Sequence, residues 1–164
     1  MIYQITPMQP DDWPSVREIY REGIATGDAT FETEVPDWEK WDSGHRQDCR
    51  LIARIGEQVL GWAALSPVSG RCVYAGVAEV SVYVAAAARG SGVGQALLQA
   101  LIEESELHRI WTLQAGIFPE NAASIALHTS RGFREVGVRR HIGKRDEVWR
   151  DVLLLERRSS TVGI

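Results

Sequence analysis

Residues 79–84 alternate in polarity, which predicts a β-strand with Glu79, Ser81 and Tyr83 on one face and three valines on the other. Residues 95–103 follow the pattern of a helix instead. Between them lies the sequence Arg-Gly-Ser-Gly-Val-Gly, residues 89–94. A strand, a basic glycine-rich turn and a helix start form a cradle for an anion, because glycines allow close approach and the first helical N–H groups favour negative charge. We therefore expect a ligand that carries a phosphate or pyrophosphate.

The same patterning divides the rest of the chain into short elements. Further strands are expected at residues 2–5, 51–55, 58–65, 111–117, 134–139 and 148–156, with the central strand over 78–84. Helices are expected from 11 to Gly27, from 38 to about 48, from the glycine-rich turn to about 107, and over 122–131. We expect one domain, residues 1–158, followed by a frayed tail, residues 159–164.

Composition excludes several classes of function. The 164 residues carry a net charge of −4, which argues against nucleic-acid and membrane-surface partners. No apolar run approaches the roughly 20 residues that span a bilayer, and the N-terminus lacks a signal pattern, so we expect a cytoplasmic protein. The two cysteines form no CxxC motif and the four histidines no ligand-spaced pair, so no metal site is expected.

Glycine spacing narrows the choice of phosphate ligand. A dinucleotide fingerprint fails, because Gln95 and Leu97 stand where its third glycine belongs, and a P-loop fails because Gly94 is followed by Gln95 and Ala96. The pattern that fits is Arg-x-x-Gly-x-Gly, at positions 89, 92 and 94. It resembles the acetyl-CoA pyrophosphate loop of the GNAT acetyltransferases. The alternative is a glycine-rich turn that binds nothing.

A second segment strengthens the resemblance. Residues 121–133 predict a helix with Asn121 as N-cap and Gly132 just past its end, and place Asn121, Ser124 and His128 on one stripe. This segment resembles the second acetyl-CoA segment of the same family, although His128 stands where many members have tyrosine. Together with Glu79-x-Ser-Val-Tyr-Val and Trp149-x-Asp151, it is similar to the phosphinothricin and methionine sulfoximine N-acetyltransferases.

The resemblance implies a fold and a co-substrate. The fold is α+β in three layers (α/β/α), a mixed and mostly antiparallel sheet flanked by helices. Acetyl-CoA is the implied co-substrate, and the implied cofactor-binding residues are Val82, Tyr83, Val84, Arg89, Gly90, Ser91, Gly92, Val93, Gly94, Asn121 and Ser124.

The resemblance also implies direct attack of an amine on the thioester, with Glu79 or His128 as catalytic base. Neither cysteine lies in a motif with a base, which agrees with a reaction without an acyl-enzyme. Sequence does not decide between the two bases. Each also has a structural alternative: Glu79 could pair with a basic residue such as Arg71, and His128 could be a hydrogen-bonded structural histidine.

The implied acceptor is a small amine, the α-amine of an amino-acid-like molecule. Arginine suits its carboxylate, which makes Arg71 the candidate ligand. The full set of implied substrate-binding residues is Phe31, Arg71, Tyr74, Ser81, Lys144, Trp149 and Asp151. Two of these residues have structural alternatives: Arg71 could be a solvated loop arginine, and Trp149 could serve core packing alone. The family resemblance further implies a homodimer.

Two rival functions stay open. One is a related enzyme for another amine, such as a protein N-terminus, a polyamine or an aminoglycoside. The other is a catalytically silent acyl-CoA-binding regulatory module, which would keep the glycine loop without needing Glu79 or His128.

Overall fold

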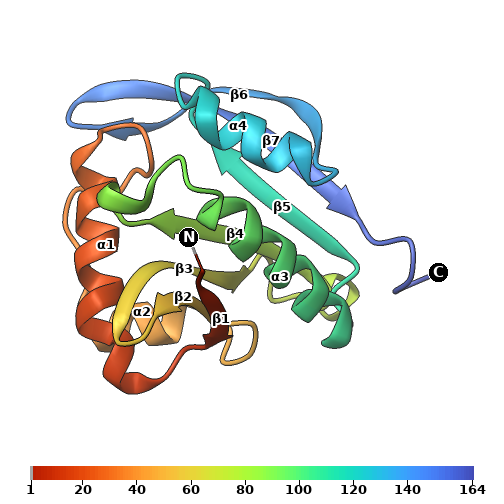
Figure 1. Cartoon of the computed structure of the whole chain (residues 1–164). Coiled ribbons are helices and arrows are strands. Elements are labelled where there is room, and N and C mark those ends of the chain that lie inside the picture. The colour runs from red at the N-terminus through yellow and green to blue at the C-terminus, as the bar shows by residue number, and fades with distance from the viewer. Residues whose placement is uncertain (1) are drawn as a thin grey trace.

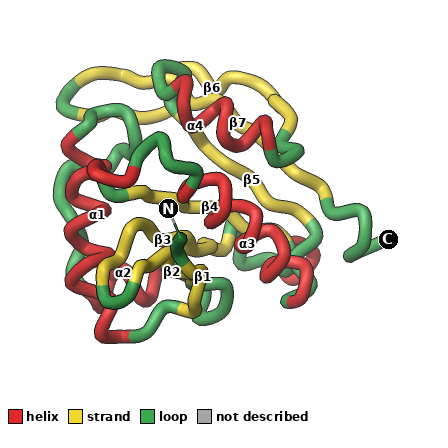
Figure 2. The backbone as a smooth tube through the Cα atoms, in the orientation of Figure 1, coloured by secondary structure: helices red, strands yellow, loops and turns green. Residues whose placement is uncertain are grey.

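The computed structural model describes residues 2–164 and confirms the α+β prediction (Figures 1 and 2). The α-helices are α1 (Trp13–Ala25), α2 (Trp38–Gly44), α3 (Val93–Leu107) and α4 (Ala122–Ser130). The strands are β1 (Gln4–Pro7), β2 (Leu51–Ile55), β3 (Gln58–Pro67), β4 (Val77–Val84), β5 (Thr112–Ile117), β6 (Arg134–Arg145) and β7 (Val148–Arg158). Short 3-10 turns precede α1, β4 and the glycine-rich loop. No helix of the described chain is long and apolar enough to cross a membrane.

The strands form one sheet in the order β1-β2-β3-β4-β5-β7-β6, antiparallel except for the β4–β5 pair. Helices α3 and α4 lie on the face turned toward the viewer in Figure 1. On that face the buried Leu97, Leu98 and Leu101 of α3 pack on the strands. On the opposite face, Val16 and Ile19 of α1 share a core with α2 and β3. The result is three layers, with the sheet in the middle.

Close backbone contact sets the start of the parallel pair. The N–H groups of Trp111 and Thr112 both donate to the carbonyl of Gly76, at 2.8 and 3.1 Å. A Cβ atom at position 76 would lie 2.0 Å from the Trp111 ring. A glycine is therefore required here, because any side chain would push β5 away from the start of β4.

Several element boundaries differ from those expected, among them the boundaries of β1, α2 and β6. Strand β1 lies at 4–7 rather than 2–5, at the sheet edge as expected. Helix α2 ends at Gly44 rather than about 48, because side chains bond its last carbonyls: His45 Nδ1 lies 2.7 Å from Trp41 O, and Arg50 bonds Asp42 O. Strand β6 continues to Arg145 rather than ending at 139, across an irregularity between 139 and 143 that breaks the alternation of side chains.

Residues 159–164 have no helix or strand, but they make contacts. Ser159 is buried, and its N–H donates to Trp111 O at 2.8 Å. The Arg158 guanidinium donates to the carbonyls of Val162 and Gly163. The fraying of this tail and the single domain over 1–158 stay predictions.

Candidate active site

A cleft of about 1720 Å³ crosses the middle of the sheet. Its walls come from β4, β5, α4, the glycine-rich loop, the α1–α2 loop and the β6–β7 hairpin. Both candidate bases line it, as do most of the predicted cofactor-binding residues: Val82, Tyr83, Val84, Arg89, Gly90, Gly92, Gly94, Asn121 and Ser124. This volume exceeds that of an ordinary small-molecule pocket, about 300–1,000 Å³, so the cleft has room for two ligands.

The cleft exists because β4 and β5 part. Their parallel register covers only three pairs, the last of which joins Glu79 to Gln114. Beyond this pair, β4 continues to Val84 and β5 to Ile117 without pairing with each other, and Figure 1 shows the two strands diverging. The edge of β4 after Glu79 is therefore open to a ligand, and the gap connects the α3/α4 face of the sheet with the α1 face.

The glycine-rich loop has the backbone of an anion cradle. Gly90 and Gly92 have φ angles of +76° and +86°, in the left-handed region, and Gly92 is the N-cap of α3. The first helical hydrogen bond runs from Ala96 N to Gly92 O, so the N–H groups of residues 93–95 have no helical acceptor. Arg89 adds a positive charge beside them. Of the predicted loop residues, Ser91 and Val93 do not line the cleft: Ser91 bonds Ala88 O, and Val93 is buried in the core.

Helix α4 places a neutral histidine in the cleft. The Asn121 side chain caps the helix by accepting from Ser124 N at 3.2 Å, as predicted. One turn on, His128 is 5 % exposed, and its Nδ1 lies 2.7 Å from the Ser124 carbonyl oxygen. A carbonyl only accepts, so Nδ1 carries the proton and Nε2 keeps its lone pair. Burial lowers the pKa of His128 below its ordinary value, so the ring is neutral at pH 7.

Glu79 lies where the strands part, on the α1 face of the sheet. Gln114 Nε2 donates to Glu79 Oε1 at 3.2 Å across the last parallel pair. The alternative that Glu79 pairs with Arg71 does not fit the structure, because the exposed Arg71 lies over the Tyr74 ring at 5.5 Å. The Glu79 carboxylate therefore faces the cleft without a basic partner in the described chain.

The wall around Glu79 on the α1 face is formed by parts of the chain far apart in sequence. A Cβ atom at Gly116 would lie 3.8 Å from Glu79 Oε1 and 3.2 Å from Val152 Cγ1. Val152 of β7 pairs with Arg139 of β6, which also lines the cleft. Phe31 packs edge-on against Phe118, with ring centroids 4.9 Å apart. These side chains form a compartment around the carboxylate.

Comparison with known proteins decides the family. The family model described as "Acetyltransferase (GNAT) family" matches residues 13–133. The chain belongs to the GNAT acetyltransferase family. A phosphinothricin N-acetyltransferase of Streptomyces coelicolor is 32 % identical, over 94 % of this chain and 95 % of that protein. An L-methionine sulfoximine/L-methionine sulfone acetyltransferase of Pseudomonas aeruginosa is 30 % identical, over 88 % of each.

Solved structures agree with this GNAT assignment. A Brucella melitensis structure named ribosomal-protein-alanine N-acetyltransferase has a TM-score of 0.88 and 34 % identity, over 95 % of this chain and 99 % of that one. A Sinorhizobium meliloti phosphinothricin acetyltransferase, solved in complex with acetyl-CoA, has a TM-score of 0.87 and 27 % identity. The match covers 99 % of this chain and 91 % of that one. The predicted fold and enzyme class, an acetyltransferase with acetyl-CoA as co-substrate, are confirmed at this level.

The residues of this GNAT chain fit acetyl-CoA. The left-handed Gly90 and Gly92 leave backbone N–H groups free for the pyrophosphate, and the open edge of β4 is available to the amide-bearing pantetheine arm. Val80, Val82 and Val84 of β4 face the α3/α4 side, while the Tyr83 side chain turns the other way and stacks on Trp62, with ring centroids 4.8 Å apart. Any contact of Tyr83 with the cofactor therefore comes from its backbone.

The predicted acceptor residues separate into two groups. Phe31 and Ser81 line the cleft, whereas Arg71, Tyr74, Lys144, Trp149 and Asp151 do not. The Lys144 ammonium lies over the Trp149 ring, and its Nζ is 3.6 Å from Glu147 Oε2. Asp151 instead accepts from His141 N at 2.8 Å, holding the backbone of the β6 irregularity, where His141 has a φ of +47°. In this structure Asp151 therefore shapes β6, and its role as a substrate contact stays a prediction.

Of the α1–α2 loop, sequence reasoning found only Phe31 and missed the other cleft residues and the side chains that hold the loop. Thr26 and residues 28–32 line the cleft, and two arginines of the β6–β7 hairpin hold this loop. Arg145 donates to the carbonyls of Ile24 and Thr30, and Arg150 donates to the Gly27 carbonyl and the Asp28 carboxylate. Nothing local marks these residues, because each contact spans more than 110 positions.

Replacement of Gly92 tests the cradle. Gly92→Ala puts a side chain on a backbone with φ +86°, which costs about 1–2 kcal/mol and disturbs the N–H groups expected to hold the pyrophosphate. At 100 times its Kd, acetyl-CoA should raise the wild-type Tm by about 5–10 °C, and Gly92→Ala should lose most of this shift. Differential scanning fluorimetry measures both.

The matched control is Gly56→Ala. Gly56 has a φ of +56° in the β2–β3 turn, outside the cleft, with no atom within 4 Å of an added Cβ. It should lose similar stability but keep the full acetyl-CoA shift. A full shift in Gly92→Ala would remove the loop from the binding site.

Proposed function

We propose that this enzyme transfers the acetyl group of acetyl-CoA to the α-amine of a small amino-acid-like acceptor, of the class named in its phosphinothricin and methionine sulfoximine relatives. The observation that carries the proposal is the gap between β4 and β5, which joins the glycine cradle on one face to the Glu79 compartment on the other. The donor thioester and the acceptor amine can then meet at the edge of β4 without sharing one face.

The chemistry proposed is direct transfer. The amine nitrogen attacks the thioester carbonyl carbon, the new C–N bond forms, the C–S bond breaks, and coenzyme A leaves as a thiolate. The ammonium proton goes to a base of the enzyme. A backbone N–H on the open edge of β4, that of Val82, polarises the carbonyl as an oxyanion donor does. Neither Cys49 nor Cys72 lies among the cleft residues, which supports attack without an acyl-enzyme.

Two groups can accept the proton. His128 is neutral with Nε2 unprotonated, because Nδ1 is engaged by the Ser124 carbonyl and burial lowers its pKa. Glu79 is a carboxylate that lies on the acceptor side of the gap, where an amine would arrive. We propose that one of the two takes the amine proton directly or through water.

The pH profile separates the two bases. Either Glu79→Gln or His128→Ala should lower kcat roughly 10²–10⁴-fold if that residue is the base. With His128 as the base, the wild-type rate falls only at a pH more acidic than the ordinary pKa of histidine, because burial lowers the pKa of His128 and keeps the ring neutral to lower pH. That limb should vanish in His128→Ala and survive in Glu79→Gln.

The measurement is kcat from pH 5 to 9, followed through free coenzyme A thiol, with acetyl-CoA thermal shifts showing that each variant still binds the donor. His141→Ala is the control, since His141 is exposed and lies outside the cleft. Near-wild-type turnover in both Glu79→Gln and His128→Ala would contradict both assignments.

Arg139 is our candidate for the acceptor carboxylate. Arg71, the candidate from sequence, lies outside the cleft, whereas Arg139 lines it and pairs with Val152, next to Glu79. Directly paired residues of an antiparallel ladder share a face, so the Arg139 side chain extends on the Glu79 side of the sheet. A guanidinium there can bind a carboxylate through two hydrogen bonds while the α-amine approaches the base.

Acceptor selectivity tests this role. A hydrogen bond to a charged group contributes about 1.5–3 kcal/mol, or roughly 10- to 150-fold. Arg139→Ala should therefore lower kcat/KM for phosphinothricin or methionine sulfoximine by about that factor, with little effect on a matched amine that lacks the carboxylate. Arg71→Ala is measured beside it. A carboxylate-selective loss in Arg71→Ala alone would return the role to Arg71.

A protein N-terminus is the second candidate acceptor, because the Brucella structure bears the name of a ribosomal-protein-alanine N-acetyltransferase. A peptide that begins with alanine offers an α-amine but no free α-carboxylate beside it. Including such a peptide in the acceptor panel decides between the two. Faster turnover of the peptide would favour protein acetylation, and binding of acetyl-CoA with no turnover on any amine would indicate a silent regulatory module.

We also propose a homodimer formed through the β6–β7 hairpin. Strand β6 is a sheet edge, and Val136, Val138, Ile142, Val148 and Trp149 of the hairpin are each between 41 and 59 % exposed. An exposed apolar strand at an edge favours association.

Light scattering should give twice the 18.3 kDa chain mass, and Val138→Glu should lower the measured mass to that of the monomer. Val73→Glu is the control, because Val73 is 59 % exposed but lies outside the hairpin, and this variant should stay a dimer. A monomeric wild type would contradict the proposal.

A further inference from the structure

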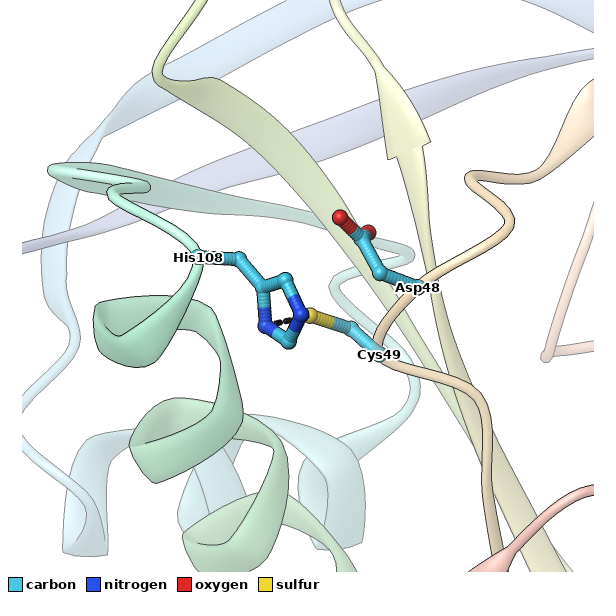
Figure 3. A group of neighbouring side chains, drawn as sticks. All are labelled: Asp48, Cys49 and His108. Carbon is cyan, nitrogen blue, oxygen red and sulfur yellow. Dashed lines mark hydrogen bonds between the residues drawn. The ribbon is translucent and has the colours of Figure 1, made fainter.

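Three side chains of metal-ligand type meet outside the cleft. Asp48 and Cys49 precede β2, and His108 follows the last residue of α3, 59 positions later. Their ligand atoms all lie within 4.8 Å of one another. Figure 3 shows the Cys49 sulfur turned toward the His108 imidazole, with Asp48 beside it on the same loop. None of the three lines the cleft, so the group has no part in the proposed transfer.

The spacing of sulfur and nitrogen fits a tetrahedral ion. Cys49 Sγ lies 3.6 Å from His108 Nδ1. With Zn–S near 2.3 Å and Zn–N near 2.0–2.1 Å, two ligands at a tetrahedral angle stand about 3.6 Å apart. The two atoms already have this separation, so a metal ion can bridge them with little movement of the chain.

Neighbouring groups orient the ligands. Arg46 bonds both oxygens of Asp48, at 2.7 and 2.8 Å, which fixes the carboxylate and leaves a lone pair on each oxygen. The Glu104 carboxylate lies 3.9 Å from His108 Nδ1 and is a candidate for a fourth ligand. His108 Nδ1 lies 2.9 Å from the Glu104 carbonyl; metal binding would replace this hydrogen bond and leave the ring proton on Nε2.

The charges balance for a divalent cation. A Cys49 thiolate and the carboxylates of Asp48 and Glu104 carry three negative charges, and Arg46 offsets one of them. Cys49 is 5 % exposed, and burial raises the pKa of its thiol to about 12, so without a metal it is a neutral thiol. His108 is exposed and gives an ion a path from solvent.

We propose that Asp48, Cys49 and His108, with Glu104 or water as the fourth ligand, bind Zn²⁺ or a similar thiol-seeking divalent cation. Binding displaces the Cys49 proton and forms the metal–sulfur bond. The ion then ties the segment before β2 to the C-terminal end of α3. The pattern of spacings in the sequence does not suggest this site, because its ligands come from two distant segments.

Cobalt(II) is the probe, because its absorption reports on the ligands. Titration of the metal-free full-length protein with Co²⁺ should produce a thiolate-to-cobalt charge-transfer band and the visible bands of tetrahedral cobalt. Zn²⁺ should displace the Co²⁺, since it binds such sites more tightly. One equivalent should suffice, and affinity should fall as the pH drops, because the thiol proton competes with the metal.

Cys49→Ser and His108→Ala should lose the charge-transfer band. Cys72→Ser and His141→Ala should keep it, as they remove the other cysteine and another exposed histidine. Saturating Zn²⁺ should also raise Tm by about 5–10 °C in wild type and Cys72→Ser but not in Cys49→Ser. No thiolate band in folded wild-type protein, or a band unchanged in Cys49→Ser, would overturn the proposal. Acetyl transfer is not a readout, so failure here leaves the proposed function intact.

Discussion

The three residue pairs over which β4 and β5 run in parallel are the constraint on which the cleft depends. Pairing begins where Trp111 packs on the bare backbone of Gly76 and ends at Glu79 and Gln114. Longer pairing would close the sheet and remove the gap. Shorter pairing would leave Gln114 without its bond to Glu79 and free the carboxylate to turn away. The position of the last pair therefore sets both the passage and the group beside it.

Strand alternation then sorts the functions of β4 between two faces. Val80, Val82 and Val84 pack toward α3 and α4, where the glycine loop begins its helix. Glu79 and Tyr83 face α1, and Tyr83 is fixed between Tyr20 and Trp62. Burial raises the pKa of Tyr83, so it stays a neutral phenol. A one-residue shift of β4 would exchange the two faces, so the valines would point toward α1 and Glu79 toward α3 and α4.

What the sequence predicted correctly is local in origin. The glycine loop and the caps of α4 depend on φ angles and hydrogen bonds within a few residues, which residue type reports directly. What it missed depends on contacts between distant segments. Arg139 lines the cleft because β6 pairs with β7 and lies with Arg139 opposite Val152, whereas Arg71, chosen for its place before β4, lies outside the cleft. Asp48 and His108 meet only after the chain has folded.

The two arginines that hold the α1–α2 loop have a consequence for how this enzyme can diversify. In the proposed arrangement, the donor half of the cleft is encoded in one stretch, from β4 to α4, whereas the loop and the hairpin around the acceptor half lie on either side of that stretch in sequence. The family model stops at residue 133, before Arg139, Arg145 and Arg150. Since Arg145 and Arg150 join loop and hairpin into one unit, the proposed arrangement lets that unit change, and the amine with it, while the donor stretch stays the same.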